Sequence, residues 1–455
     1  MGGGIIQLTS LGTQDNYLIS NPQYSFFKAV YRRHTNFSIE SVQQTFDKHV
    51  KVESTTVTSK IANVGDLIYH TWLDISLFKE GFSVSEGQDE GTYSAWTNGT
   101  GYAFIKEYEL KIGGQKIDKH YSSWLDIYNE LTDHDDREWM GANKHASKSL
   151  YLESSLTLPN LKLYIPLKFW FCRKVALALP LVALQYHDVE ISFTTRNVNT
   201  LINTNATTGS ATPVTKDPEV NLWVDYIHLD NDERRRFAQN SHEYLIEQVQ
   251  MEEYPAETNL LQTVNFNHPV KELIWVIQKN NIKEEKEFKA DVSGIDAKLN
   301  SDITLVNSND YFCYQSTEDN IEEFYGIEQK ENFSTFRLLI NGIDRFPERK
   351  ASYFRLCQPI QAGHSLSTKH IYMYSFSLKP EEYQPSGTCN FSRINDIKMS
   401  FTGTMNNSTL TVYAVNYNIL RIKSGMGGIV FTGNPRVVKK KVKTQKRSVR
   451  GRRKG

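Results

Sequence analysis

Short strand-like segments follow one another along most of the chain, and they constrain its fold more than any other feature. They are rich in Val, Ile, Thr, Tyr and Phe, and clusters of Gly, Asn, Pro and Ser separate them. β-branched and aromatic residues fit the half-buried surface of a pleated sheet. The predicted strands are 38–46, 51–59, 67–78, 102–112, 189–195, 244–251, 272–278, 335–340, 370–378, 397–401 and 408–418. Few stretches have helical periodicity, so the pattern predicts an all-β chain.

Several of these segments alternate apolar with polar side chains. In segment 408–418, Leu410, Val412 and Ala414 fall on one face, and the residues between them fall on the other. Side chains of a strand point alternately to its two faces, so this period predicts sheets with one buried face.

Turn residues mark where strands end. Gly113-Gly114 and Asn341-Gly342 each lie between two strand-like runs. Both predict tight hairpin turns, because Gly and Asn adopt positive φ at low cost. Residues 80–100 and 197–220 are rich in Asn, Thr, Ser and Gly, and we expect two long exposed loops there.

The length of the chain favours two domains. One β-sandwich usually takes about 200–250 residues, and the chain has 455. A short helix is predicted at 230–240, where Asp230 can cap the N-terminus and Glu233, three residues on, fits a capping box. We place the domain boundary just before this helix.

A faint internal repeat also suggests two domains. The run 39–43 (IESVQ) resembles 246–250 (IEQVQ), and 110–114 (LKIGG) resembles 338–342 (LLING). The first pair lies 207 residues apart and the second 228, which an extra loop of about 21 residues in the second half would explain.

The candidate chemical motifs favour a non-enzymatic protein. Asp133-His134-Asp135-Asp136 fits either a metal cluster or a solvated acidic loop, and we favour the loop, because a hard cation needs a convergent set of oxygens. His364 and His370 have no known zinc spacing, and we expect both at the surface. The phosphate-loop, GxSxG and HExxH patterns are absent from the sequence. We therefore expect no catalytic residue, metal or cofactor.

The four cysteines and the N-terminal segment indicate in which cellular compartment the protein is found. Cys172, Cys313, Cys357 and Cys389 form no close pair, and we expect reduced thiols. The most apolar stretch, 175–184, is too short to span a bilayer, and no signal peptide is apparent. We expect a soluble protein. The N-x-S/T sequons leave glycans open as partners; they lie at Asn36, Asn98, Asn205, Asn332, Asn390, Asn406 and Asn407.

Long ordered motifs resemble the major capsid proteins of nucleocytoplasmic large DNA viruses. The first are 14–23 (QDNYLISNPQ), 26–28 and 30–37 (VYRRHTNF). Others are 229–239 (LDNDERRRFAQ), 268–275 (HPVKELIW), 341–346 (NGIDRF), 374–382, 384–393, 416–418 and 424–428 (SGMGG). The chlorovirus, iridovirus and marseillevirus types are the most similar in length and motif.

The resemblance implies two tandem jelly-roll β-sandwiches, each with eight main strands in two sheets, joined by a short helix. It also implies a homotrimer that forms a pseudo-hexagonal tile of an icosahedral shell, contacts neighbouring capsomers and minor capsid proteins, and is assembled in the host cytoplasm. The expected division is an N-terminal arm at 1–20, a first jelly roll at 21–229, a linker helix at 230–240, a second jelly roll at 241–432 and a basic tail at 433–455. The alternatives are a minor or penton-type jelly-roll protein of the virion, or a carbohydrate-binding or carbohydrate-cleaving β-sandwich.

Two basic clusters remain to be explained. Arg234, Arg235 and Arg236 lie in the linker helix, where they contact either a nucleic acid or acidic groups of the two domains or of another subunit. We favour the ion pairs, because the planar guanidinium pairs a carboxylate through two hydrogen bonds.

The second basic cluster is the C-terminal tail. The chain has no net charge, but residues 1–435 carry a net charge of −11 and the tail carries 11 basic residues. The tail is either a disordered solubilising terminus or a contact to an anionic partner: an internal viral membrane, a minor capsid protein or DNA. Its basic residues are Arg436, Lys439, Lys440, Lys441, Lys443, Lys446, Arg447, Arg450, Arg452, Arg453 and Lys454.

Overall fold

A computed structural model describes residues 3–23, 25–29, 31–84, 94–97, 99–132, 158–204, 211–280, 311–314, 331–367 and 369–432. The chain forms two units, Met1–Phe37 and Ser38–Gly455. The first unit carries two short helices, α1 (Gly3–Thr9) and α2 (Asn16–Ile19). Both β-sandwiches belong to the second unit. Among the residues that the structure describes, no helix has the length and apolar character needed to cross a membrane.

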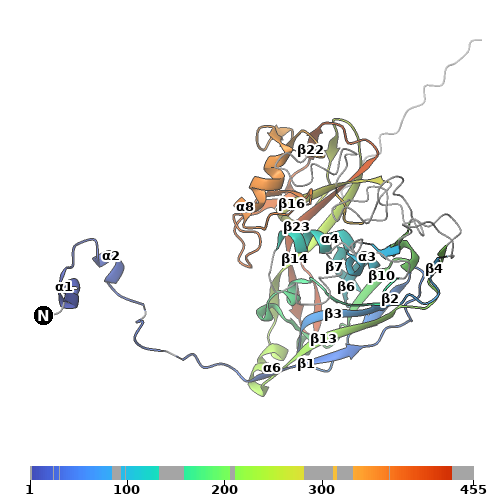
Figure 1. Cartoon of the computed structure of the whole chain (residues 1–455). Coiled ribbons are helices and arrows are strands. Elements are labelled where there is room, and N and C mark those ends of the chain that lie inside the picture. The colour runs from blue at the N-terminus through green and yellow to red at the C-terminus, as the bar shows by residue number, and fades with distance from the viewer. Residues whose placement is uncertain are drawn as a thin grey trace, which may run out of the picture. The chain divides into compact units, whose positions relative to one another are not determined.

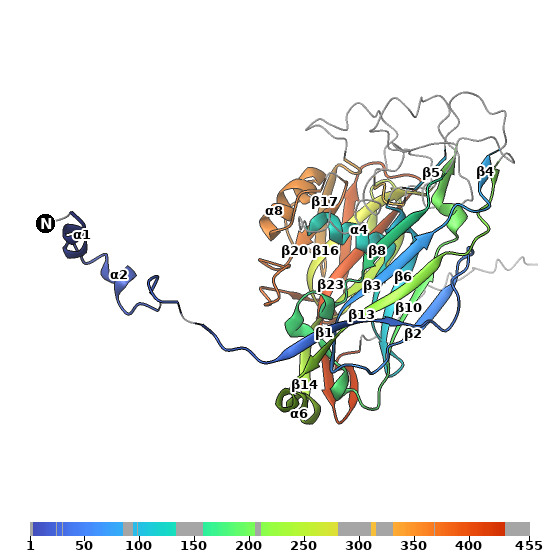
Figure 2. The ribbon, with the colours of Figure 1, turned by 60° about the horizontal axis from the view of Figure 1, so that its bottom comes forward.

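The first sandwich is built from two antiparallel sheets. One sheet has the order β1 (Phe37–Gln44), β13 (Glu219–Leu229), β3 (Leu67–Leu77), β8 (Leu161–Pro166), with β9 (Leu179–Pro180) also paired to β3. The other has the order β2 (Thr56–Lys60), β10 (Val189–Thr195), β6 (Ile105–Ile112), β7 (Gln115–Tyr121). Figure 2 shows β1, β13 and β3 running side by side. Leu73, Leu110 and Phe193 are buried in the core between the sheets, as the alternation of apolar residues predicts.

The second sandwich repeats this plan. One sheet has the order β14 (His242–Ala256), β23 (Ser408–Lys423), β16 (Pro269–Lys279), β20 (Tyr372–Ser375), with β21 (Cys389–Asn390) paired to β16 and β24 (Met426–Ile429) paired to β23. We call it the shared sheet, because both of its faces are buried. The other has the order β15 (Leu261–Thr263), β22 (Ile397–Thr402), β17 (Thr335–Ile340), β18 (Ile343–Asp344), with β19 (Arg349–Lys350) paired to β17.

Both sandwiches have the same strand order. When the eight main strands of each are numbered along the chain, one sheet reads 1-8-3-6 and the other 2-7-4-5 in both halves. This is the jelly-roll arrangement, so the chain is a double jelly roll. The repeats seen in the sequence fall on equivalent strands: 39–43 and 246–250 lie on the first strand of each half, and 110–114 and 338–342 at the end of the fourth. The connection before that fourth strand is longer in the second half, where it runs from 280 to 334.

The shared sheet separates two apolar cores. β16 directs Leu273, Trp275 and Ile277 into the core of the second sandwich, and Ile274 and Val276 into the core that contains the first sandwich. β23 alternates in the same way, so residues 408–418 are almost all buried. The prediction of a single buried face is wrong for this strand, because its other face packs against the first jelly roll.

Helices and short turns fill the connections. Among the described residues of the second unit, the α-helices are α3 (Thr100–Phe104), α4 (Ser122–Leu131), α6 (Asn231–Gln239) and α8 (Gln358–Ala362). The described part of the chain also contains the 3-10 turns η3 (Trp170–Cys172), η4 (Val175–Leu177), η5 (Leu181–Ala183), η6 (Val198–Leu201) and η9 (Phe391–Arg393), and the π-helical turn η8 (Tyr353–Cys357). α6 matches the predicted linker helix. Asp230 caps it by accepting a hydrogen bond from the backbone N–H of Asn231, 2.8 Å away.

Parts of both predicted loops are buried, so the expectation of long exposed loops is wrong there. β5 (Ser94–Trp96) pairs with β11 (Ile202–Thr204), and β4 (Ser83–Val84) pairs with β12 (Ala211–Thr212). The indole of Trp96 is 1% exposed and donates a hydrogen bond to the carbonyl of Pro159. Apolar side chains at 96, 201 and 202 draw these polar-rich segments into the core.

Candidate functional site

The candidate site is the junction where the shared sheet packs against the first jelly roll. Figure 1 shows α4 in front of the strands of the shared sheet. The rings of Trp124 on α4 and Tyr413 on β23 lie 5.4 Å apart, and the hydroxyls of Ser123 and Tyr413 share a hydrogen bond. The side-chain amide of Gln248 on β14 donates to the carbonyl of Ile117 on β7. Apolar packing and hydrogen bonds therefore both join the two halves.

A group of buried charges lies beside this contact. The guanidinium of Arg173, just after η3, donates to Glu247 on β14. Lys271 on β16 lies 3.0 Å from the same carboxylate, and its side chain is 1% exposed. Burial alone would raise the pKa of Glu247, but Arg173 and Lys271 outweigh burial and hold that pKa below its ordinary value. Glu247 is thus ionised and bridges cations from both jelly rolls.

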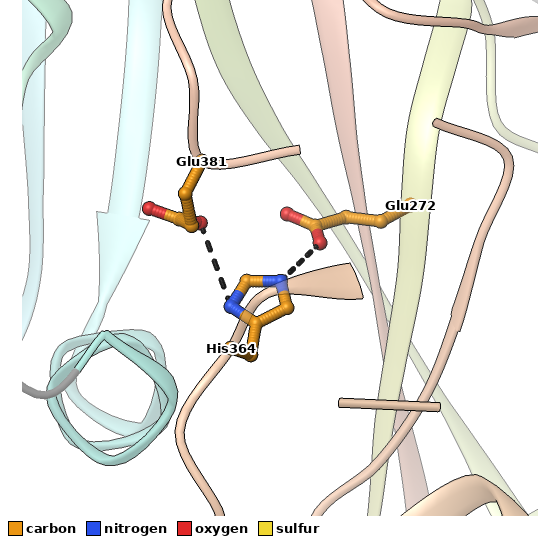
Figure 3. Close-up of side chains that lie close together, drawn as sticks. All are labelled: Glu272, His364 and Glu381. Carbon is orange, nitrogen blue, oxygen red and sulfur yellow. Dashed lines mark hydrogen bonds and ion pairs between the residues drawn. The ribbon is translucent and has the colours of Figure 1, made fainter. Parts of the chain in front are cut away.

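A second group of buried ionisable side chains lies next to the first. Glu272, next to Lys271 on β16, accepts a hydrogen bond from Nε2 of His364 at 2.9 Å. Nδ1 of His364 lies 3.7 Å from Oε1 of Glu381, which belongs to the segment between β20 and β21. Figure 3 shows the imidazole between the two carboxylates. Burial alone would lower the pKa of His364, but Glu272 and Glu381 raise it above its usual value.

These contacts correct the expectation of surface histidines. The side chain of His364 is 1% exposed, and His370 is also buried. The sequence contained one usable signal: β16 reads PVKELIWVIQK, with Lys271 and Glu272 side by side just before the apolar run 273–277. A charged pair inside such a strand must find partners when the strand is buried on both faces.

A third ionic group ties α4 to the second jelly roll. Asp126 of α4 is fully buried, and Lys369 lies 2.6 Å from its Oδ1. The hydroxyl of Tyr314 donates to its other oxygen at 3.0 Å. Burial raises the pKa of Asp126 to about 6, although Lys369 pulls in the opposite direction.

A cavity of about 450 Å³ opens beside these groups. The first jelly roll contributes Trp72, Tyr128 and Arg173 to its lining, and the second contributes Glu381 and Tyr417. The ring of Tyr128 lies 5.0 Å from the guanidinium of Arg173, which is within the range of a cation–π contact. The cavity lining is thus aromatic and ionic, and it belongs to both halves of the molecule.

The arginines of the linker helix behave differently from one another. The guanidinium of Arg234 donates to both oxygens of Asp66, at 2.8 and 3.0 Å, and so ties α6 to the first jelly roll. Arg235 and Arg236 are exposed, and neither makes an ion pair with any residue that the structure describes. The basic tail, 436–454, and the acidic cluster at 133–136 lie outside the described residues.

The contacts of the junction hold the two jelly rolls together. Its ionised groups face one another across the two jelly rolls. The two sandwiches are packed together across one sheet. The fold therefore defines the class as a double jelly-roll protein, and jelly rolls occur both in viral capsids and in lectins.

Comparison with known proteins identifies the family. Residues 25–230 match the family described as "Major capsid protein N-terminus", and residues 233–428 match "Large eukaryotic DNA virus major capsid protein". The major capsid proteins of Pyramimonas orientalis virus and Paramecium bursaria Chlorella virus 1 are 39% and 37% identical to this chain; each alignment covers 95% of the chain and all of the relative. The chain belongs to the major capsid proteins of large eukaryotic DNA viruses, which are structural proteins of the virion.

Solved structures agree with this assignment. The PBCV-1 capsid protein VP54 superposes with a TM-score of 0.71 at 34% identity, covering 90% of this chain and all of VP54. The Faustovirus major capsid protein has a TM-score of 0.66 at 12% identity, covering 91% of this chain and 94% of that one, so its similarity is one of fold.

Proposed function

We propose that three copies of this chain form a capsomer with a pseudo-hexagonal outline that tiles an icosahedral shell. The observation that carries the proposal is the pair of jelly rolls with one strand order, fixed to each other by the shared sheet. Three such chains present six similar sandwiches, so a three-fold assembly can fill a six-fold position in a lattice. The remaining side faces are free to contact neighbouring capsomers.

The mass of the purified protein in solution tests the trimer. We expect a particle close to three times the chain mass of 52.4 kDa, stable at micromolar concentration, with a hexagonal outline in electron micrographs. A protein that stays monomeric under these conditions would contradict the proposal.

We propose further that the functional parts follow the division expected from the sequence: arm 1–20, jelly rolls 21–229 and 241–432, linker 230–240 and tail 433–455. In support, α6 lies between the eighth strand of the first half and the first strand of the second. Assembly in the host cytoplasm and contacts to minor capsid proteins belong to the same proposal. The exposed asparagines at 36, 390, 406 and 407 are better candidates for glycans than Asn332, which is buried and donates to the carbonyl of Tyr314.

We propose that the basic tail binds a polyanionic surface inside the shell. Its 11 basic residues sit on a chain whose other residues are net acidic. Each basic residue near an anionic membrane contributes about 1 kcal/mol, and salt weakens the attraction.

Deletion of residues 436–455 tests the proposal for the tail. Binding of the full chain and of the truncated chain to anionic vesicles and to DNA is compared at low and high salt. We expect the full chain to bind either the vesicles or the DNA at low salt and to lose this binding at high salt. The truncated chain should lack the same binding at low salt. Unchanged binding to both would rule out lipid and DNA as partners.

A further inference from the structure

Three metal-ligating side chains from separate segments converge at the edge of the junction. Glu272 comes from β16, His364 from the segment after α8, and Glu381 from the segment between β20 and β21. One ligand atom of each lies within 4.8 Å of the other two. We propose that His364 and Glu381 bind a divalent transition cation such as Zn²⁺, and that Glu272 orients the imidazole.

The distance between the two proposed ligands fits a bridging ion. Nδ1 of His364 and Oε1 of Glu381 lie 3.7 Å apart, which is too long for a hydrogen bond. A zinc ion forms bonds of about 2.0–2.2 Å to such atoms, and at angles between tetrahedral and trigonal these bonds hold the nitrogen and oxygen roughly 3.4–3.7 Å apart. The side chains therefore need little movement to accept the ion.

Glu272 supplies the orientation that such a site requires. Its carboxylate accepts a hydrogen bond from Nε2 of His364, so the neutral ring carries its proton there and presents the lone pair of Nδ1 to Glu381. Metal-binding histidines commonly hydrogen-bond a carboxylate through their other nitrogen. Nδ1 is buried and has no hydrogen-bond partner among the described residues, which is the position that an ion would satisfy.

The local charges also favour a cation. Among the described residues, the carboxylates of Glu247, Glu272 and Glu381 gather here against two permanent cations, Lys271 and Arg173. One negative charge remains, and either a proton on His364 or a metal ion offsets it. Binding of the metal replaces the proton at Nδ1, so one proton leaves the imidazolium for each ion bound.

The ion also has an entry path and room for further ligands. Glu381 lines the cavity of about 450 Å³, and its side chain is 29% exposed. Water from the cavity can complete the coordination. An imidazole nitrogen with a carboxylate oxygen suits Zn²⁺, Cu²⁺ or Ni²⁺, whereas Mg²⁺ prefers oxygen ligands alone. The ion would link the segment after α8 to the segment between β20 and β21, and the hydrogen bond from His364 to Glu272 ties the site to the shared sheet.

Zinc binding by the full chain tests the proposal. The purified assembly is loaded with Zn²⁺, exchanged into metal-free buffer and analysed for metal per chain, and its melting temperature is measured with Zn²⁺ and with Mg²⁺. We expect about one retained zinc per chain and a higher melting temperature with Zn²⁺ only.

Two neighbouring glutamates provide the matched comparison. Glu381→Gln removes a proposed ligand, and we expect it to abolish both the retained zinc and the thermal shift. Glu382→Gln changes an exposed carboxylate that pairs with Lys379, and we expect both signals to persist. His364→Gln should behave as Glu381→Gln does, provided that it folds. If the unmodified chain retains no more zinc than Glu381→Gln, His364 carries only a proton here and the proposal is wrong.

Discussion

Glu247 shows how single residues hold the two jelly rolls together. Its carboxylate meets Arg173 from the first half and Lys271 from the second, and the side chain of Lys271 is 1% exposed. A buried ion pair contributes little net stability over apolar packing, but the loss of one partner leaves an uncompensated charge. Removal of Glu247 should therefore destabilise the junction by more than the net stability that the intact ion pair contributes.

Replacement of Glu247 should be far more costly than replacement of its neighbour Glu243. We expect Glu247→Gln to lower the free energy of unfolding by roughly 3–5 kcal/mol, because Lys271 stays buried, and Arg173 partly buried, without the anion that bridges them. Glu243 also lies on β14, but it pairs with Arg421 at an exposed position, and Glu243→Gln should cost less than about 1 kcal/mol. Denaturant unfolding of the two variants checks this, and equal losses would contradict it.

Asp126 gives the junction a pH dependence of known sign. Its folded pKa of about 6 lies above the value near 3.8 of an unperturbed carboxyl, so the folded state holds the proton more tightly than the unfolded state does. The contribution of Asp126 to the free energy of unfolding is therefore fully present below pH 4, and it is lost as the pH rises from about 4 to about 6. A shift of two pKa units corresponds to about 3 kcal/mol.

The variant Asp126→Asn should not show this loss. We compare the free energy of unfolding of the variant with that of the unmodified chain at each pH. This difference should shift in favour of the variant by up to about 3 kcal/mol as the pH rises from 4 to 8. Thermal unfolding of both proteins across this pH range measures the difference. A difference that stays constant with pH would show that Asp126 does not titrate in this way.

At the scale of elements, the sequence predicted most of the strands. It did not predict the elements whose formation depends on tertiary packing. β10 and β17 match their predicted ranges, because their alternation reflects one buried face. α4 was not predicted, and the buried strands β5 and β11 lie in segments whose composition is typical of loops. The environment of His364 was also out of reach, because its partners Glu272 and Glu381 come from other segments that only the fold brings together.

The position of α6 depends on one carboxylate. Asp66 accepts two hydrogen bonds from Arg234 and a third from the backbone N–H of Leu229, at 2.8 Å. We expect Asp66→Asn to lower the free energy of unfolding by about 1–3 kcal/mol, because the amide offers a single acceptor oxygen and no charge. The exposed pair of Asp188 with Lys60 is the control, and Asp188→Asn should cost less than about 1 kcal/mol. Similar results for both variants, measured by denaturant titration, would argue against an anchoring role.

At the scale of the whole molecule, the two jelly rolls are joined by a common apolar core as well as by α6. The shared sheet places Ile246, Ile274 and Tyr413 in the same apolar core as the first sandwich. Burial of these side chains depends on the other half, and the hydrophobic effect therefore couples the folding of the two.

We expect the second unit to unfold in one calorimetric transition. Residues 241–432 expressed alone should aggregate or bind hydrophobic dyes, since one face of the shared sheet becomes exposed. The chain without residues 436–455 is the control and should keep the single transition. Two well-separated transitions, or a soluble fragment that binds no dye, would show that each jelly roll is stable by itself.

The strand order of the jelly roll has an evolutionary consequence. In the second half, His242 at the start of the first strand pairs with Ile422 near the end of the last, so the chain enters and leaves the sandwich at one place. The first half also pairs its first strand with its last. A gene for one such module can be copied in tandem with a connector as short as residues 230–241, and neither copy needs to change its topology. Duplication followed by divergence of the facing surfaces is thus a short route from a single sandwich to a two-sandwich shell tile.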